Sequence, residues 1–222
     1  MRPALVPLLL ALAAGSSARA EEPEIPEEGL STATTVLLGG HYAYGVDPLP
    51  NDHRHEVLGD LRARVALGGP RVGYLLGLDG SLGGSDTGLV VDLDVHLVGA
   101  AVRWRLGMIG LSTGLGVGVV RGSLPLSARI PLEVFVDAAA GPVRLLATFT
   151  MRLSLASDAQ DVTLGDFADD LGASLHVRFG REHRYWGDTV AGAGPALGLT
   201  YRERSGGRMV GVALALALSG AN

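Results

Sequence analysis

The sequence predicts an all-β fold, a closed antiparallel up-and-down barrel of about ten strands, with eight or twelve strands as alternatives. Apolar and polar residues alternate with a period of two over segments of about eleven residues, as in long strands that have two different faces. The links between these segments tend to alternate between short and long. Glycine, with 33 residues, is frequent throughout and disfavours helices.

The N-terminal segment has the features of a secretory signal peptide. Arg2 precedes an apolar run over residues 4–14, and small residues at Ala18 and Ala20 precede an acidic stretch. The run is shorter than the roughly 20 residues that a helix needs to span a bilayer, although a retained membrane anchor is the alternative. We therefore expect three parts: a signal peptide over residues 1–20, a flexible acidic lead-in over residues 21–30, and one barrel domain over residues 31–222.

The alternation is clearest in two segments. Over residues 57–67 the odd positions are apolar or glycine, while the even positions include Arg62 and Arg64. Over residues 143–155 the odd positions are again apolar, opposite arginine, threonine and serine. Successive side chains of a strand point to opposite faces, so each strand has one apolar and one polar face. The same split recurs over residues 128–138 and 171–179.

The expected strands are bounded by links of two kinds. The links after the second and sixth strands are tight, and those after the first and seventh strands are long, which is typical of barrels with short turns at one end. The link REHRYWGDT after the eighth strand is longer than this rule prefers. The ten strands are expected at residues 32–45, 57–67, 71–82, 88–105, 107–119, 127–139, 143–155, 171–180, 190–203 and 208–218.

Two features of these strands require irregular pairing. In the fourth segment the apolar positions change from odd to even around Gly99, which predicts a β-bulge, whereas a hairpin turn there would change the strand count. Pro131 and Pro195 lie inside strands and lack an amide donor. Each proline therefore needs a bulge or an irregular pair.

Strand length favours a membrane barrel over a soluble β-sandwich. Two-faced strands occur in both, but strands average about 5 to 6 residues in soluble proteins and need about 9 to 11 to cross a membrane. The expected segments are near the longer figure. The mean hydropathy of +0.31 is also high for a soluble β protein.

Composition excludes several functions. The chain has no cysteine, which removes disulfides, thiolate metal sites and a cysteine nucleophile. All 18 residues of the Lys and Arg class are arginine. The formal net charge is −5, and it becomes −7 without the two arginines of residues 1–20. A nucleic-acid partner is therefore not expected.

The polar faces of a closed ring of strands point into its lumen. A narrow lumen is packed with side chains, and charges buried there have to be paired. We therefore predict an ion-pair network in which five arginines meet five carboxylates and nearly neutralise the interior. Its members are Arg62, Arg64, Asp79, Asp92, Asp94, Glu133, Asp137, Arg144, Arg152 and Arg178. The opposite face should form one apolar outer band that includes Leu61, Val65, Leu145, Leu153 and Val177.

Candidate catalytic and metal sites are weaker than this network. Asp92, Asp94 and His96 share one strand face and could hold a metal, but pairing with arginines is the favoured interpretation. Ser174 and His176 could form a nucleophile and base, but no third residue is evident to orient the histidine. We expect no catalytic residue, no metal and no cofactor.

Two sets of loop residues could also bind cations. The first set is five loop carboxylates that could bind Ca²⁺. They lack the spacing and the glycine of an EF-hand loop, so a solvated acidic loop is the favoured interpretation. The histidines could bind a transition metal, and an exposed loop accounts for them equally well. The carboxylates are Asp158, Asp161, Asp166, Asp169 and Asp170, and the histidines are His41, His53 and His55.

The chain resembles the small bacterial outer-membrane β-barrel proteins over about residues 30–219. The resemblance rests on the signal peptide, the long strands, the alternating links and the closing run RMVGVALALALSG. The resemblance implies insertion in the outer membrane, contact with outer-membrane lipid and recognition by the barrel-insertion machinery. Those proteins usually end on an aromatic residue, whereas this sequence ends LSGAN. Aromatic residues near expected strand ends are typical of interfacial girdles: Tyr42, Tyr44, Trp104, Tyr185, Trp186 and Tyr201.

The function expected from the sequence is that of a non-enzymatic outer-membrane barrel of structural or surface-interaction type. Its lumen is expected to be largely filled by side chains. A narrow pore for small solutes is the alternative, and a barrel that hydrolyses lipid or peptide is the third possibility. A periplasmic or secreted location is the alternative to the outer membrane.

Overall fold

The structure is a computed structural model. It describes residues 31–46, 55–69, 71–86, 88–104, 107–120, 127–140, 143–156, 170–180, 182–184, 190–204 and 207–221. The expected signal peptide and lead-in, residues 1–30, lie outside this part of the chain, as do Tyr185 and Trp186 and the carboxylates at 158–169. Within the described residues, no helix is long and apolar enough to cross a membrane.

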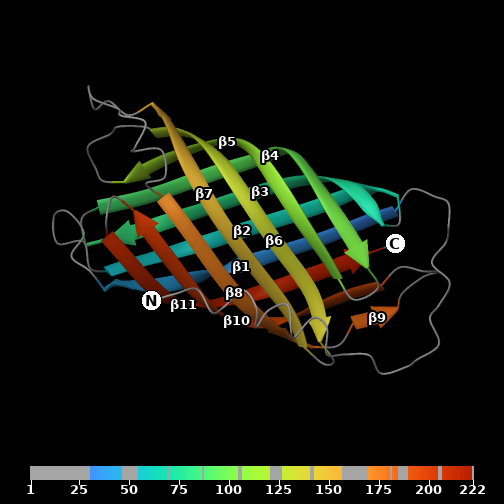
Figure 1. The fold of residues 1–222 in the computed structure, drawn as a ribbon. Helices are drawn as coiled ribbons and strands as arrows, with labels where there is room; N and C mark the ends of the chain where they lie inside the picture. The colour runs from blue at the N-terminus through green and yellow to red at the C-terminus, as the bar shows by residue number, and fades with distance from the viewer. Residues whose placement is uncertain are drawn as a thin grey trace, which may run out of the picture.

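Ten long strands form one closed antiparallel sheet, and each pairs with its neighbours in chain order (Figure 1). The last strand pairs with the first from Ala33 opposite Ala221 to Gly45 opposite Met209, and it also pairs with the strand before it. This ring confirms the up-and-down barrel. The strands are β1 (Ser31–Gly45), β2 (His55–Gly68), β3 (Val72–Ser85), β4 (Gly88–Trp104), β5 (Gly107–Val120), β6 (Ser127–Ala140), β7 (Val143–Ala156), β8 (Asp170–Phe179), β10 (Val190–Arg204) and β11 (Gly207–Ala221).

β2, β4 and β6 end, and β3, β5 and β7 begin, at the end of the barrel where β1 begins and β11 ends, which we call the short-turn end. At the opposite end β1 and β7 end and β2 and β8 begin, and we call it the long-link end. The long link expected after the eighth strand contains one further strand, β9 (Glu182–Arg184), which pairs with β10. This three-residue strand was not predicted.

The alternation of each strand separates a polar interior from an apolar outer surface. On β2 the even residues from Glu56 to Ala66 are buried or half-buried and face the lumen. Of the five residues expected in the outer band, Leu61 is exposed and the other four are half-buried, on the face opposite the lumen. Elsewhere on the outer face, Leu199 and Leu214 are each 63% exposed. Since exposed leucines are costly in water, this outer surface is suited to an apolar solvent.

The phase change in the fourth strand is a β-bulge, as predicted, and it is centred on Leu97. His96 pairs with Gly114 and Val98 pairs with Thr113, so Leu97 is the extra residue. The Tyr74 hydroxyl donates a hydrogen bond to the Leu97 carbonyl. The bulge keeps β4 a single strand with its inner residues inward on both sides of it.

Both prolines lie where a ladder is interrupted. Pro131 pairs with Arg152 of β7, but the ladder between β5 and β6 passes directly from Thr113–Leu132 to Gly116–Arg129. On β10, pairing with β9 ends at Gly192 and pairing with β8 begins at Ala196, so Pro195 lies in the gap between them. The missing amide donors therefore coincide with missing ladder bonds.

Deleting Leu97 should leave a folded barrel, because the remaining residues of β4 then alternate without a phase change. The lost hydrogen bond from Tyr74 should cost about 1 kcal/mol. Deleting Leu93, an outward residue with no bulge beside it, should turn Asp94 and His96 towards the outer surface and prevent folding. Denaturant unfolding of both variants in micelles measures the difference. Equal loss of the folded barrel in both would contradict this role of the bulge.

Candidate functional site: the charged lumen

All ten residues of the predicted network face the lumen. Asp137, Asp94 and Arg178 are at most 1% exposed, and Arg64, Asp79, Asp92 and Glu133 are also buried. The three half-buried members, Arg62, Arg144 and Arg152, bond to other lumen residues. The side chains form two main clusters and several smaller contacts, described in turn below.

The first cluster is centred on Arg64 of β2. Its Nε donates to Glu133 Oε1 at 2.6 Å, its second terminal nitrogen donates to Glu133 Oε2, and the same nitrogen lies 2.5 Å from Asp79 Oδ2. The guanidinium therefore bridges two carboxylates from β3 and β6. Such fork-shaped pairing is the strongest hydrogen bonding that arginine makes, and it fixes both carboxylates in place.

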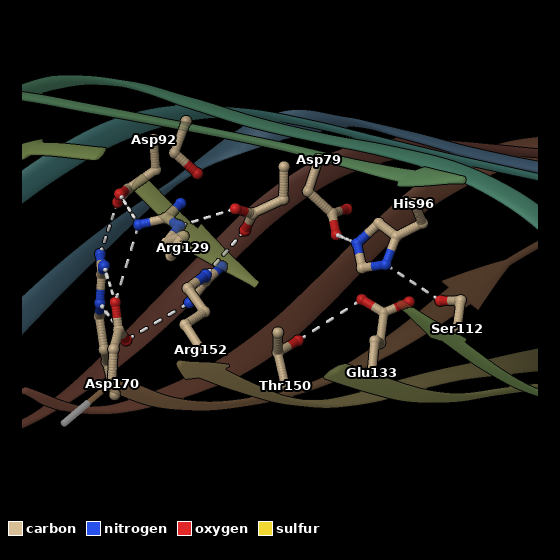
Figure 2. Close-up of polar contacts among 12 residues, drawn as sticks. Asp79, Asp92, His96, Ser112, Arg129, Glu133, Thr150, Arg152 and Asp170 are labelled. Atoms are coloured by element: carbon tan, nitrogen blue, oxygen red, sulfur yellow. Dashed lines mark hydrogen bonds and ion pairs between the residues drawn. The ribbon is translucent and has the colours of Figure 1, made fainter. Parts of the chain in front are cut away.

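A histidine extends this first cluster towards β5 (Figure 2). His96 Nε2 lies 3.0 Å from Asp79 Oδ2, and Ser112 Oγ lies 3.0 Å from His96 Nδ1. A hydroxyl, an imidazole and a carboxylate thus stand in line, as they do in hydrolases. Ser112 is only 2% exposed, however, and the Asp79 carboxylate is already bonded to Arg64. The three side chains are enclosed in the lumen, and their hydrogen bonds hold one another in place.

The second cluster is centred on Asp94 of β4, and Figure 2 labels its members Asp92, Arg129, Arg152 and Asp170. Asp94 accepts hydrogen bonds from Arg129 at 2.7 Å and from Arg152 at 2.7 Å, one on each oxygen. Arg129 also donates to Asp92 at 2.6 Å. Arg202 of β10 donates to Asp92 at 2.9 Å and to Asp170 at 2.7 Å. Arginines and carboxylates therefore alternate through the cluster, so that each charge touches opposite charges.

Three sets of contacts cross the full width of the barrel. Thr35 of β1 bonds to Asp137 of β6, Arg62 of β2 donates to Thr148 of β7 at 2.7 Å, and Arg202 of β10 reaches Asp92 of β4. In each pair the two strands are five positions apart in a ring of ten, which is diametrically opposite. Hydrogen bonds therefore span the lumen at several levels.

The sequence analysis missed six charged residues of the lumen. With them, the described interior holds eight carboxylates and eight guanidinium groups. Arg129 was expected on the same polar face of its strand as Glu133 but was left out of the predicted network. Asp170 was expected in a solvated loop, which is wrong: it begins β8 and binds Arg152 and Arg202. The full sets are Glu56, Asp60, Asp79, Asp92, Asp94, Glu133, Asp137 and Asp170, and Arg62, Arg64, Arg103, Arg129, Arg144, Arg152, Arg178 and Arg202.

The described residues that were considered as metal ligands do not come together as a metal site. Asp92 and Asp94 bind Arg129, whereas His96 turns to Asp79. His41 faces inward and lies 2.5 Å from Asp60, while His55 is exposed on the outer side beside Tyr42, so these two histidines do not converge. His53 lies outside the described residues.

Two further contacts bear on sites for metal and for catalysis. Ligand atoms of Asp79, His96 and Glu133 lie within 4.8 Å of one another, but the Arg64 cation bridges the two carboxylates. Ser174 and His176 share the inner face of β8 as predicted, and the Ser174 hydroxyl bonds to Arg62 and lies 2.8 Å from Thr148 Oγ1. Neither contact leaves an exposed reactive group.

Small residues make room for the long side chains. The inner face of β5 has Gly110, Ser112, Gly114 and Gly116, and that of β11 has Ala213, Ala215 and Ala217. A Cβ atom placed on Gly116 would lie 1.9 Å from Asp94 Oδ1. Within the described part of the lumen, a cavity of about 30 Å³ lies beside Arg62, Arg64, Phe135, Leu146 and His176, with room for only one or a few water molecules.

Comparisons with known proteins give no family. No protein-family model matches the chain, and no curated protein matches it significantly by sequence. Among solved structures, the outer membrane protease OmpT from Escherichia coli aligns over 90% of this chain and 98% of its own, with 8% identity and a TM-score of 0.28. OpdO from Pseudomonas aeruginosa aligns over 86% and 96%, with 8% identity and a TM-score of 0.21. At these TM-scores the likeness carries no functional inference.

Replacing Gly116 by alanine should destabilise the barrel by about 1 to 3 kcal/mol, because the new methyl group displaces Asp94 from Arg129 and Arg152. Gly84→Ala is the matched control, since a Cβ there has no atom within 4 Å. Thermal or denaturant unfolding in micelles measures both. A loss for Gly84→Ala as large as that for Gly116→Ala would show that the effect does not come from the lumen network.

Proposed function

We propose that the chain is an outer-membrane β-barrel protein of structural or surface-interaction type whose lumen is closed by its own side chains. The observation that carries the closed lumen is the set of contacts between diametrically opposite strands, from Thr35, Arg62 and Arg202. A solute passing along the barrel would have to break charge-assisted bonds in a narrow interior.

The membrane location is supported by the outer surface. Tyr42 and Tyr44 are exposed near the long-link end, and Tyr74 and Trp104 are exposed near the short-turn end. On β2, Val57 pairs with Tyr42 and Leu67 pairs with Tyr74, and these two β2 residues are about 33 Å apart along the strand. With a typical barrel tilt this gives a height of about 25 Å, the height of the apolar band of outer-membrane barrels.

An interfacial contact is also built at the long-link end. The Tyr42 hydroxyl lies 2.7 Å from His55 Nδ1, and the His55 ring packs edge-on against Tyr44. Aromatic rings with a polar edge are suited to the boundary between lipid tails and headgroups. This cluster supports contact with outer-membrane lipid.

A narrow pore is the alternative function, and the cavity beside Arg62 and His176 is the observation that favours it. A hydrolase is the third function, favoured by the line of Ser112, His96 and Asp79. The burial of Ser112 argues against access of a lipid or peptide to this line. Lipid or peptide hydrolysis that is lost in Ser112→Ala would establish the hydrolase instead.

An arginine placed on the outer face should destabilise the barrel according to its depth. Leu214→Arg, in the middle of β11, should cost about 2 to 4 kcal/mol in lipid, whereas Val210→Arg, next to Tyr44 and Tyr201, should cost about 0 to 1 kcal/mol. Equilibrium unfolding from lipid vesicles measures both. Equal costs at the two depths would contradict a membrane-spanning orientation.

The intact barrel should give no steady conductance in a planar bilayer. The triple variant Arg62→Ser, Arg64→Ser and Arg202→Ser removes contacts that cross the lumen and should conduct, which also shows that insertion is detected. Folding of each sample is checked by its resistance to SDS without heating. Steady conductance of the intact barrel, with an ion selectivity that changes in Arg62→Glu, would establish the narrow pore.

A further inference from the structure

A histidine and two carboxylates gather on the inner wall of the barrel towards its long-link end. His41 of β1 pairs across the strands with Leu58 of β2, so it lies between Glu56 and Asp60, the two inner neighbours of Leu58. The His41 Nδ1 atom lies 2.5 Å from Asp60 Oδ2, and its Nε2 atom lies 3.8 Å from Glu56 Oε1. The three side chains are at most 14% exposed, so the imidazole stands between two carboxylates inside the lumen.

The hydrogen bond to Asp60 fixes the tautomer of the His41 ring. A carboxylate accepts hydrogen bonds, so in the neutral ring Nδ1 carries the proton and Nε2 carries a lone pair on the side of Glu56. Asp60 is itself held in place, since the Ser81 hydroxyl donates to its other oxygen at 2.7 Å. Histidines that bind metals have this arrangement, in which one ring nitrogen donates to a carboxylate and the other binds the ion.

The gap between His41 and Glu56 suits a bridging ion. At 3.8 Å the Nε2 and Oε1 atoms are too far apart for a direct hydrogen bond. An ion that binds a nitrogen and an oxygen at about 2.0 to 2.2 Å in tetrahedral geometry holds these two atoms about 3.4 Å apart. A closer approach of about 0.4 Å would therefore let one ion bind both side chains.

The charges of the site also favour a divalent cation. Glu56 and Asp60 bring two negative charges beside a neutral imidazole, and a divalent ion balances them in an interior where charges need partners. Arg202 lies 4.0 Å from Glu56 Oε1, but its charge is shared with two other carboxylates. Both bordering arginines bond to other groups: Arg202 to Asp92 and Asp170, and Arg62 to Thr148 and Ser174.

We propose that His41 and Glu56 bind a divalent transition-metal ion such as Zn²⁺ towards the long-link end of the lumen, with Asp60 as a positioning residue. An imidazole nitrogen and a carboxylate oxygen are both ligands that Zn²⁺ prefers, and water completes its coordination. The ion would join β1 to β2 next to the link between them. The site depends on the inner wall alone, so it is independent of the proposed membrane function and is testable in micelles.

Isothermal titration of Zn²⁺ into the untagged, folded barrel in micelles tests this site. The intact protein should bind one Zn²⁺ ion that depends on His41, and both His41→Gln and Glu56→Gln should abolish this binding. Asp60→Asn should weaken it by about 10- to 100-fold, because the histidine loses the carboxylate that orients it. His55→Gln is the matched control and should leave the affinity unchanged, since this histidine is exposed on the outer face.

Electron paramagnetic resonance with Cu²⁺ gives a second readout. Coupling of the bound copper to a histidine nitrogen should be present in the intact barrel and lost in His41→Gln. The folding of each variant is checked by its resistance to SDS without heating. Absence of zinc binding by the intact barrel, or binding that is unchanged in Glu56→Gln and in Asp60→Asn, would overturn the proposal. These two variants keep the size of the side chains, so they decide even if His41→Gln does not fold.

Discussion

The pairing of buried charge is the constraint on which this barrel depends. Closing ten strands into a ring turns eight carboxylates and eight guanidinium groups of the described residues into a narrow interior, where an unpaired buried charge costs several kcal/mol. Asp94 illustrates the solution, with one arginine on each oxygen. Because the partners come from different strands, removing one charge weakens pairing on several of them: without Arg129, Asp94 would keep only Arg152 and Asp92 only Arg202.

Arginine suits this constraint for two physical reasons. Its side chain is long enough to meet a side chain from the opposite wall, as Arg202 meets Asp92, and its fork binds two carboxylates at once, as Arg64 does. The space for these side chains is provided by neighbouring strands with small inner residues. Gly116 beside Asp94 shows that the small and the charged residues form one packing unit.

The sequence predicted the ring, its ten long strands and the bulge, because a period of two is a local property that each strand reveals by itself. It also placed ten lumen charges on the correct face for the same reason. It could not reveal which charges touch, since Arg202 and Asp92 are joined only by the curvature and stagger of the closed sheet. Asp170 was assigned to a loop because neighbouring aspartates hide the start of β8. The strand β9, with three residues, is too short to have a period.

The pairing of β1 with β11 joins the two most distant parts of the described chain. Ala33 meets Ala221, and the ring has no complete wall until the final strand is in place. Bringing such remote segments together carries a large loop-closure entropy and makes folding slow. Until then the exposed apolar side chains of the outer face lack their final environment, and the two open sheet edges can pair with other chains. Closure of the ring therefore requires β11, the last described strand, to be paired on both sides, and until then the edges of β1 and β10 stay open.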